Sequence, residues 1–334
     1  MSEYRRDPIT SRWVIVNTDT PWQPDHYPAD NNEVPSLEFS PFIYGREHLT
    51  PPEIDAIHAE NSSDWLTRVI PNKFPALGIE GDLDPVDKGM YYLTNGIGAH
   101  EVLIETPDPV QQMCDHSDEQ MFNIFSMYQR RYIDLAKDTR FKYLSIFKNF
   151  GHSAGASIYH AHSQLIALPM VPINVLDQII GVKNYENSKG RNVYQDILNK
   201  ECEDELRIVE ETENFLVFCP FAARHAFEMR LMPKDIGSKY QDLSENQLRE
   251  LGSLMMRVLK RLEVCLSNPS FNYYLQLDPM NSENESYLWN IEILPKLNHF
   301  AEFDREVGFF TVQTPPEMAA QILRESKVIE NIVT

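Results

Sequence analysis

Two histidines and a glutamine, His160, His162 and Gln164, recur at every second position near the middle of the chain. We predict a strand from His160 to Leu168, in which alternation turns these three side chains to one face. Residues two apart on a strand lie about 6.5 Å apart, because each residue rises roughly 3.3 Å. Two imidazoles and an amide can therefore line one small site.

The segment before this strand is rich in glycine and serine, with Gly151, Ser153, Gly155 and Ser157 close together. Such a loop can turn backbone N–H groups toward an anion. Loop and strand together indicate a phosphate-sized pocket that faces nucleophilic side chains. The alternative is an ordinary loop and an edge strand with surface histidines, since short motifs also match by chance.

Histidine is suited to attack phosphorus because its neutral nitrogen is available near pH 7. Donors must then neutralise charge on the equatorial oxygens of the transferring group. The backbone amides near Gly155, the Ser157 hydroxyl and the Gln164 amide are candidates for this task. Unlike a third histidine, a glutamine cannot protonate a leaving oxygen, so the site favours acceptors with a phosphate oxygen over water.

The composition narrows the class of protein. The 334 residues are 42% hydrophobic and 24% charged, with a net charge of −20, which is ordinary for a globular protein with small-molecule ligands. A nucleic-acid partner is not expected, because such proteins normally have a basic face. No apolar run approaches the ~20 residues that span a membrane. No signal peptide is visible and the cysteines form no CxxC pair, so we expect a cytoplasmic protein without membrane contact.

The elements along the chain form two similar series. Each contains a strand ending in proline, an alternating strand, a helix opened by a capping box and two further strands. The helices follow Ser117 and Ser244, and the last strands, His160–Pro169 and Tyr287–Pro295, both end in Leu-Pro. Only the first series carries the histidine pair.

This repetition predicts an α+β fold of two lobes, each an antiparallel sheet with a covering helix. Residues 1–200 would form the lobe with the histidines, and residues 201–334 the lobe without them. The acidic run Glu201–Glu211 is interpreted as a solvated face.

The segment NFGHSAGASIYHAHSQ, residues 149–164, resembles the active-site signature of the galactose-1-phosphate uridylyltransferase family. That family is the branch of the histidine-triad superfamily in which His-x-His-x-Gln replaces His-x-His-x-His. Its fold of two histidine-triad-like lobes agrees with the two series of elements. Other segments with family counterparts are RRDPITSRWVIV, EHLTPPEI, VIPNKFPAL, HEVLIETPDP, PFAARHAFE and WNIEILPKL.

The resemblance implies a role for each matching residue. His162 would be the nucleophile that forms a nucleotidyl-histidine, and the backbone carbonyl of His160 would orient its ring. The implied binding residues are Ser157 and Gln164 for the transferring phosphoryl group, Asn149 and Gly155 for the nucleotide phosphates, and Asn72 and Phe74 for the nucleoside.

The implied reaction is a ping-pong exchange of a nucleoside monophosphate between a nucleotide sugar, such as UDP-glucose, and a sugar 1-phosphate. A related branch accepts inorganic phosphate, so a nucleotide-sugar phosphorylase acting on ADP-glucose or a similar donor is the close alternative. A catalytically weak nucleotide-binding protein is an alternative of another class. The sequence decides neither the base nor the sugar. Family members are commonly homodimers, and we expect a homodimer here.

The sequence departs from the family at its metal ligands. Members often hold zinc with a CxxC pair, a histidine after Thr-Pro-Asp and the first signature histidine. Ser40, Ile43 and Pro109 occupy the first three of these positions here. One imidazole, that of His160, does not make a tetrahedral site, so we predict no zinc and no other cofactor.

Some members hold a second metal with histidines near Gln276, Asn290 and Glu292. None of these is histidine in this chain, so we predict that the second site is empty as well. A basic residue that commonly follows the first strand is replaced by Thr20, which weakens ordinary diphosphate binding. His152 can supply this charge or lie exposed, and we favour the exposed interpretation.

Four further residues receive weaker assignments. His100 lies on an alternating strand, and we predict a structural role for it. In the family the acceptor's phosphate is bound after the second Leu-Pro, where Lys296, His299 and Arg305 lie in this chain. The register there is too loose to assign one of these three.

Overall fold

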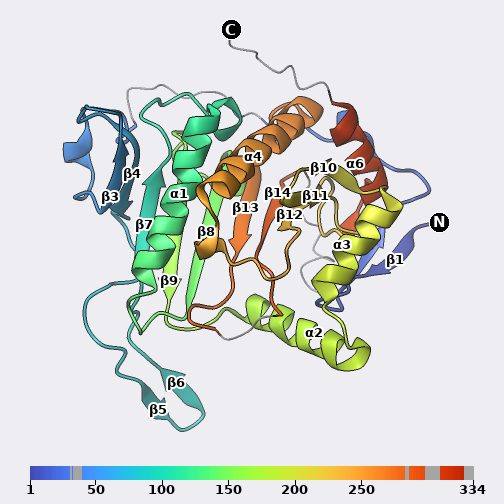
Figure 1. The fold of residues 1–334 in the computed structure, drawn as a ribbon, viewed down its shortest axis with the longest axis horizontal. Coiled ribbons are helices and arrows are strands. Elements are labelled where there is room, and N and C mark those ends of the chain that lie inside the picture. Colours follow the sequence, from blue (N-terminus) through green and yellow to red (C-terminus); the bar gives the residue numbers. More distant parts are fainter. Residues whose placement is uncertain (31, 33–39, 283–285, 298–308, 327–334) are drawn as a thin grey trace.

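The computed structural model describes residues 1–334 apart from 31, 33–39, 283–285, 298–308 and 327–334. Its centre is a ten-stranded sheet (Figure 1) in which neighbouring strands run antiparallel. In sheet order the strands are β3 (Asp55–His58), β4 (Trp65–Pro71), β7 (Ala99–Ile104), β9 (His162–Leu168), β8 (Tyr143–Phe150), β13 (Phe271–Gln276), β14 (Asn290–Pro295), β12 (Met229–Pro233), β11 (Phe215–Phe218) and β10 (Ile208–Glu211).

The strand order repeats from each edge of the sheet toward its centre. β3, β4, β7, β9 and β8 form the first copy, and β10, β11, β12, β14 and β13 form the second copy in the matching order. The copies meet where β8 pairs with β13, from Phe150 opposite Phe271 to Ile146 opposite Leu275. The predicted α+β fold of two duplicated antiparallel units is therefore confirmed, with their sheets joined into one.

One face of the sheet is covered by one long helix from each copy (Figure 1): α1 (Asp118–Leu135) and α4 (Glu245–Leu266). Each helix begins after the predicted capping serine, Ser117 or Ser244. The serine hydroxyl accepts a hydrogen bond from the backbone N–H three residues on, which satisfies one of the donors that a helix start leaves open.

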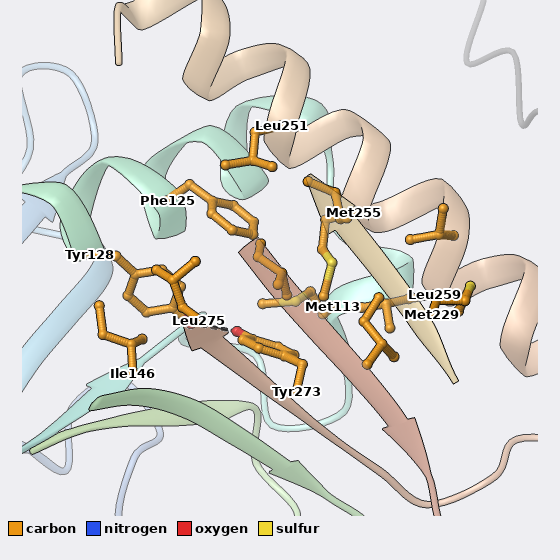
Figure 2. Packing of buried hydrophobic residues seen from close by; sticks show 14 of the residues in the cluster. Met113, Phe125, Tyr128, Ile146, Met229, Leu251, Met255, Leu259, Tyr273 and Leu275 are labelled. Atoms are coloured by element: carbon orange, nitrogen blue, oxygen red, sulfur yellow. Dashed lines mark hydrogen bonds between the residues drawn. The ribbon is translucent and has the colours of Figure 1, made fainter. Parts of the chain in front are cut away.

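The main core lies between these helices and the sheet (Figure 2), where Phe125 of α1 and Leu251 of α4 are both fully buried. Buried polar groups need partners, and three hydroxyls supply them to one another. The Tyr128 hydroxyl lies 2.5 Å from the Tyr273 hydroxyl and donates to Ser163 Oγ at 2.6 Å. This chain of hydroxyls links α1 to β13 and to β9.

The helices α2 (Ile173–Lys189) and α3 (Val193–Asp204) pack against the second copy on the other side of its strands. Leu216 and Phe218 of β11 join Tyr194 of α3 in one cluster, whereas the residues between them belong to the main core. The boundary that we predict at residue 200 falls inside α3, and the division into two domains stays a prediction.

Smaller elements lie outside the large sheet. They are a three-stranded sheet of β1 (Glu3–Arg6), β2 (Trp13–Val16) and β15 (Phe310–Val312), the helix α6 (Pro316–Glu325), and a hairpin of β5 (Val86–Lys88) and β6 (Tyr91–Leu93) that projects from the body in Figure 1. β15 runs parallel to β2, so a strand from near the start of the chain pairs with one that follows the large sheet. None of the helices within the described ranges is both long and apolar enough to cross a bilayer.

Candidate active site

His162 is the first residue of β9, and its side chain points away from the helix-covered face, because its neighbour Ser163 bonds to Tyr128 of α1. The Nδ1 atom of His162 lies 2.8 Å from the carbonyl oxygen of His160. A carbonyl can only accept, so Nδ1 carries the proton of the neutral ring. The lone pair of Nε2 is then available to attack an electrophile.

The prediction that the strand begins at His160 is wrong, because β9 starts at His162 and His160 lies in the bend before it. The buried His160 ring is bonded elsewhere: Nδ1 lies 2.9 Å from the Ser40 hydroxyl and Nε2 lies 2.7 Å from the Thr106 carbonyl oxygen. These bonds take the residue out of the alternating pattern. They also engage both ring nitrogens, so the residues described at the family's zinc position do not fit a zinc ion.

Burial keeps the His162 ring neutral. Removal from water disfavours the imidazolium form and is the largest influence on the pKa of His162. The His160 carbonyl partly offsets this influence, while the nearby ammonium of Lys148 adds to it, and the pKa of His162 falls to about 4. At neutral pH the ring is therefore uncharged, as a nucleophile requires.

An open cavity of about 260 Å³ lies beside His162. The loop that follows β8 forms much of its wall, and Gly151 and Gly155 hold this loop with φ of 82° and 88°, a region that favours glycine. Ser157 and His152 are exposed and line the same cavity. The loop and His162 thus face one cavity. Because His152 is exposed and also lines this cavity, both of its predicted roles stay predictions.

The second copy braces this loop. Asn149 accepts a hydrogen bond from Asn272 Nδ2 at 2.7 Å, and the same amide donates to the Ala154 carbonyl at 2.9 Å. Asn272 lies on β13, directly opposite Asn149 across the junction of the copies. Sequence reasoning did not find Asn272, because its use depends on a pairing between segments 123 residues apart.

The other predicted binding residues form a second group along β9. Gln164 Oε1 lies 2.9 Å from His100 Nε2, and Asn72 Nδ2 lies 3.0 Å from the same nitrogen. Phe74 follows on the same loop and is 84% exposed, so its ring is open to a ligand. The structure therefore brings Asn72 and Gln164 together through His100, and neither residue is among those that line the cavity with Ser157.

A buried ion pair behind His162 was also missed by sequence reasoning. Lys148 Nζ lies 2.7 Å from Glu105 Oε2 and 3.2 Å from the His162 carbonyl oxygen, and neither side chain of the pair is more than 2% exposed. Alternation places Lys148 between Ile146 and Phe150 on the apolar face of β8. A lysine at a position that alternation assigns to the apolar face needs a charged partner. The lysine at this position was therefore the signal in the sequence that could have revealed the ion pair.

The second copy has an ion cluster on the corresponding strand. Glu292 of β14 lies 2.8 Å from Arg224 and 2.8 Å from Arg230. Burial alone raises the pKa of Glu292, but the two guanidinium groups outweigh it and lower the pKa to about 2. Because these cations occupy the carboxylate, the described residues do not fit a metal ion at the family's second site.

One other group of possible metal ligands occurs in the described part of the chain. The ligand atoms of Cys114, Asp115 and Glu263 all lie within 4.8 Å of one another. Lys260 reaches Asp115 at 3.4 Å and Glu263 at 2.5 Å, and so provides the positive charge there. Burial and the adjacent carboxylates raise the pKa of the Cys114 thiol to about 12, against the thiolate that a metal needs. We assign no metal to this group.

The remaining predicted residues are not gathered at the cavity. Thr20 is exposed, and its carbonyl accepts a hydrogen bond from Asn17 Nδ2 at 2.8 Å. The backbone N–H of Lys296 donates to the Ser270 carbonyl at 2.8 Å. The other two residues considered for the acceptor's phosphate, His299 and Arg305, lie outside the described residues.

Known proteins resemble this chain over nearly its whole length. A family described as the N-terminal domain of DUF4931, a domain of unknown function, matches residues 90–171. The ADP-glucose phosphorylase of Arabidopsis thaliana is 31% identical over 331 residues, which cover 97% of this chain and 92% of that protein. The galactose-1-phosphate uridylyltransferase of Thermotoga maritima is 29% identical, over 98% of this chain and 99% of that protein.

The solved structure of Arabidopsis ADP-glucose phosphorylase with bound ADP-glucose superposes with a TM-score of 0.82 at 28% identity, covering 98% of this chain and 99% of that one. Sequence, fold and signature thus agree, and the chain belongs to the galactose-1-phosphate uridylyltransferase family.

Proposed function

We propose that this protein is a nucleotidyltransferase that moves a nucleoside monophosphate from a nucleotide sugar to a sugar 1-phosphate through a covalent intermediate on His162. The observation that carries the proposal is the state of the His162 ring. The ring is neutral, it is fixed by the His160 carbonyl, and His162 lines an open cavity walled by a glycine-rich loop.

In the first half-reaction, Nε2 of His162 attacks the phosphorus atom that bears the nucleoside. The bond from this phosphorus to the bridging oxygen breaks, and the electron pair leaves with the sugar 1-phosphate. Hydrogen bonds from the Ser157 hydroxyl, the Gln164 amide and the backbone near Gly155 would neutralise the equatorial oxygens. Asn149 would lie along the phosphates, and the nucleoside would bind at Asn72 and Phe74.

In the second half-reaction, a phosphate oxygen of the acceptor attacks the nucleotidyl-histidine. The phosphorus–nitrogen bond breaks, and its electron pair returns to Nε2. An acceptor that already carries an ionised phosphate oxygen needs no general base, which suits a site with Gln164 in place of a third histidine.

A phosphorylase that uses inorganic phosphate as acceptor is the second candidate. It is favoured by the 31% identity to a protein named ADP-glucose phosphorylase, beside 29% to a named galactose-1-phosphate uridylyltransferase. The nucleophile and the first half-reaction are the same in both candidates. They differ in whether a sugar is attached to the phosphate that attacks second.

Three further properties belong to the same proposal. Catalysis proceeds without zinc, since both nitrogens of His160 are engaged by Ser40 and Thr106. The protein works in the cytoplasm, consistent with its scattered free cysteines. It forms a homodimer, for which the hairpin tip with Met90 and Tyr91, 87% and 70% exposed, offers apolar surface.

The test is covalent labelling. The protein is incubated with UDP-glucose or ADP-glucose labelled at the phosphate next to the nucleoside, and acid-labile, alkali-stable label on the protein is counted. We expect label on the native protein and none on His162→Gln, with kcat/KM lowered by roughly 10⁴-fold or more because the nucleophile is lost. His58→Gln, which changes an exposed histidine on β3, is the matched control and should label normally.

The acceptor is then identified by chasing the label. Release by galactose 1-phosphate supports the transferase, and release by inorganic phosphate alone supports the phosphorylase. Absence of label with every nucleotide sugar tried would leave the third possibility, a nucleotide-binding protein without turnover.

A further inference from the structure

His100 on β7 contacts three parts of the candidate site at once. Its Nδ1 accepts a hydrogen bond from the Ala76 backbone N–H at 3.1 Å, and its Nε2 lies 2.9 Å from Gln164 Oε1. Its carbonyl oxygen accepts the backbone N–H of Asn72 at 2.8 Å. The loop of residues 72–76 and the side chain of Gln164 are thus attached to one imidazole.

The hydrogen bond from Ala76 fixes the tautomer of His100. A backbone N–H can only donate, so Nδ1 must carry the lone pair, and the proton of the neutral ring lies on Nε2. Nε2–H then donates to Oε1 of Gln164. The carboxamide of Gln164 is held with its oxygen toward His100, and its NH₂ group is left to donate elsewhere.

Asn72 is oriented by the same arrangement. The Phe74 backbone N–H donates to Asn72 Oδ1 at 2.9 Å, which turns the Asn72 NH₂ group toward His100 Nε2 at 3.0 Å. Because Nε2 already donates its proton to Gln164, it has no lone pair to accept from this amide. With this tautomer the contact at 3.0 Å brings two donors together, and we assign no hydrogen bond between Asn72 and the His100 ring.

We propose that His100 is a positioning residue that couples nucleoside binding to phosphoryl transfer. A nucleoside that orders the 72–76 loop also fixes the position of the Ala76 N–H. This N–H determines the tautomer of His100, and the tautomer determines which end of the Gln164 amide faces the phosphorus atom. This inference rests on the proposed function, because it takes Gln164 as the donor to the transferring group. It extends the structural role predicted for His100 into a link between the 72–76 loop and Gln164, which lies 64 residues beyond His100.

The test uses the full-length protein in single-turnover labelling of His162 with UDP-glucose and ADP-glucose, over a range of donor concentrations. His100→Leu removes both hydrogen bonds of the ring, and we expect the limiting labelling rate to fall by about 10- to 100-fold, as when one oriented donor is lost. His100→Gln restores an N–H near the position of Nε2 but does not reproduce the acceptor for Ala76. It should recover most of the rate while the concentration for half-maximal rate stays raised.

A double substitution separates positioning from general damage. If His100 acts through Gln164, then His100→Leu adds no loss of rate in a protein that already carries Gln164→Ala. Ile70→Val, which trims a buried side chain on the adjacent strand β4, is the control for lost packing and should leave the rate unchanged.

Three results would reject the coupling. They are a native rate in His100→Leu, losses that multiply in the double variant, and no recovery of rate in a folded His100→Gln. If the native protein is labelled and His100→Leu is labelled at the same rate, this inference alone is rejected. Native protein that never labels rejects the proposed function and this inference with it.

Discussion

Strands β9 and β14 occupy matching places in the two copies but offer different chemistry on the face opposite α1 and α4. β9 carries His162, which lines an open cavity, and Gln164 two residues further along the same face. β14 carries Glu292, which two arginines neutralise within the protein. The first strand presents a neutral ring with a free nitrogen lone pair, whereas the second presents a carboxylate paired with two arginines beside a smaller cavity.

This difference shows how the same place in a duplicated scaffold can hold a neutral nucleophile or a charged cluster. A buried charge must be paired, and Glu292 is paired with Arg224 and Arg230 beside a cavity of about 90 Å³. His162 avoids the cost of a buried charge because it stays neutral, and among the described residues the only hydrogen-bond partner of its ring is the His160 carbonyl at Nδ1. The charge in the first copy, that of Lys148, is matched by Glu105 on the helix-covered face of the sheet.

The strongest test of this division of roles is Glu292→Gln. It leaves Arg224 and Arg230 without their shared carboxylate, and we expect a loss of unfolding free energy on the order of 3–5 kcal/mol, measured by urea denaturation. Protein that is still folded at low temperature should label at His162 at the native rate. The control is Glu245→Gln, which removes an exposed pair with Arg249 and should cost within about 0.5 kcal/mol.

Loss of labelling in folded Glu292→Gln would break the comparison, since the ion cluster would then take part in the chemistry of the first copy. A stability change no larger than that of Glu245→Gln would contradict the assignment of Glu292 as a closed, buried centre.

A second test concerns acid stability. His116 is buried near Lys148 and, among the described residues, neither of its ring nitrogens has a partner. Burial first, and then Lys148, lower the pKa of His116 to about 4, although Asp115 and Asp108 oppose this shift. The unfolded chain takes up a proton below pH about 6.5 while the folded chain does so only below about 4. Stability is therefore full above pH 6.5 and falls as the pH drops to 4.

His116→Phe should remove this contribution, on the order of 3 kcal/mol between pH 6.5 and 4, from the pH dependence of unfolding. Burial also lowers the pKa values of His162 and His225, so part of the acid sensitivity should persist. The measurement is the urea midpoint at several pH values, with the exposed His58→Gln as control. An unchanged slope in His116→Phe would show that His116 is hydrated or paired in solution.

The smallest expected effect is that of Ser40→Ala. The variant removes the hydroxyl bonded to His160 Nδ1, and we expect a cost of about 1 kcal/mol in stability. Labelling of His162 should stay within about threefold of native, because the bond from His160 Nε2 to Thr106 still holds the backbone that orients the nucleophile. Ser40→Thr keeps a hydroxyl and serves as the control. A labelling loss above tenfold would mean that the side chain of His160 itself orients His162.

Much of the fold could be predicted because its signals are local. The capping serines at Ser117 and Ser244 and the proline-ended strands reveal the two copies without any long-range contact. The nucleophile pair was also local, since the bond from His162 Nδ1 spans two residues. The family resemblance added the roles of the surrounding residues, which local patterns do not contain.

The contacts that adjust the site could not be predicted because they join distant segments. Ser40 reaches His160 across 120 residues, and Asn272 reaches Asn149 across 123. The first of these contacts shifted the start of β9, since a ring held from outside the sheet removes its residue from the ladder. Alternation describes a strand by itself and contains no information about such partners.

The second copy lacks the histidine pair, but through the junction between β8 and β13 it supports the strand that leads into the site. β8 leads into the glycine-rich loop that lines the cavity, and it has no free edge because β9 and β13 flank it. Without the second copy, β8 would become an edge strand paired with β9 alone and open to aggregation, and Asn149 and Ala154 would lose their hydrogen bonds to Asn272. A substitution in the second copy can therefore disturb the loop that lines the cavity of the first copy, although it lies across the junction from that cavity.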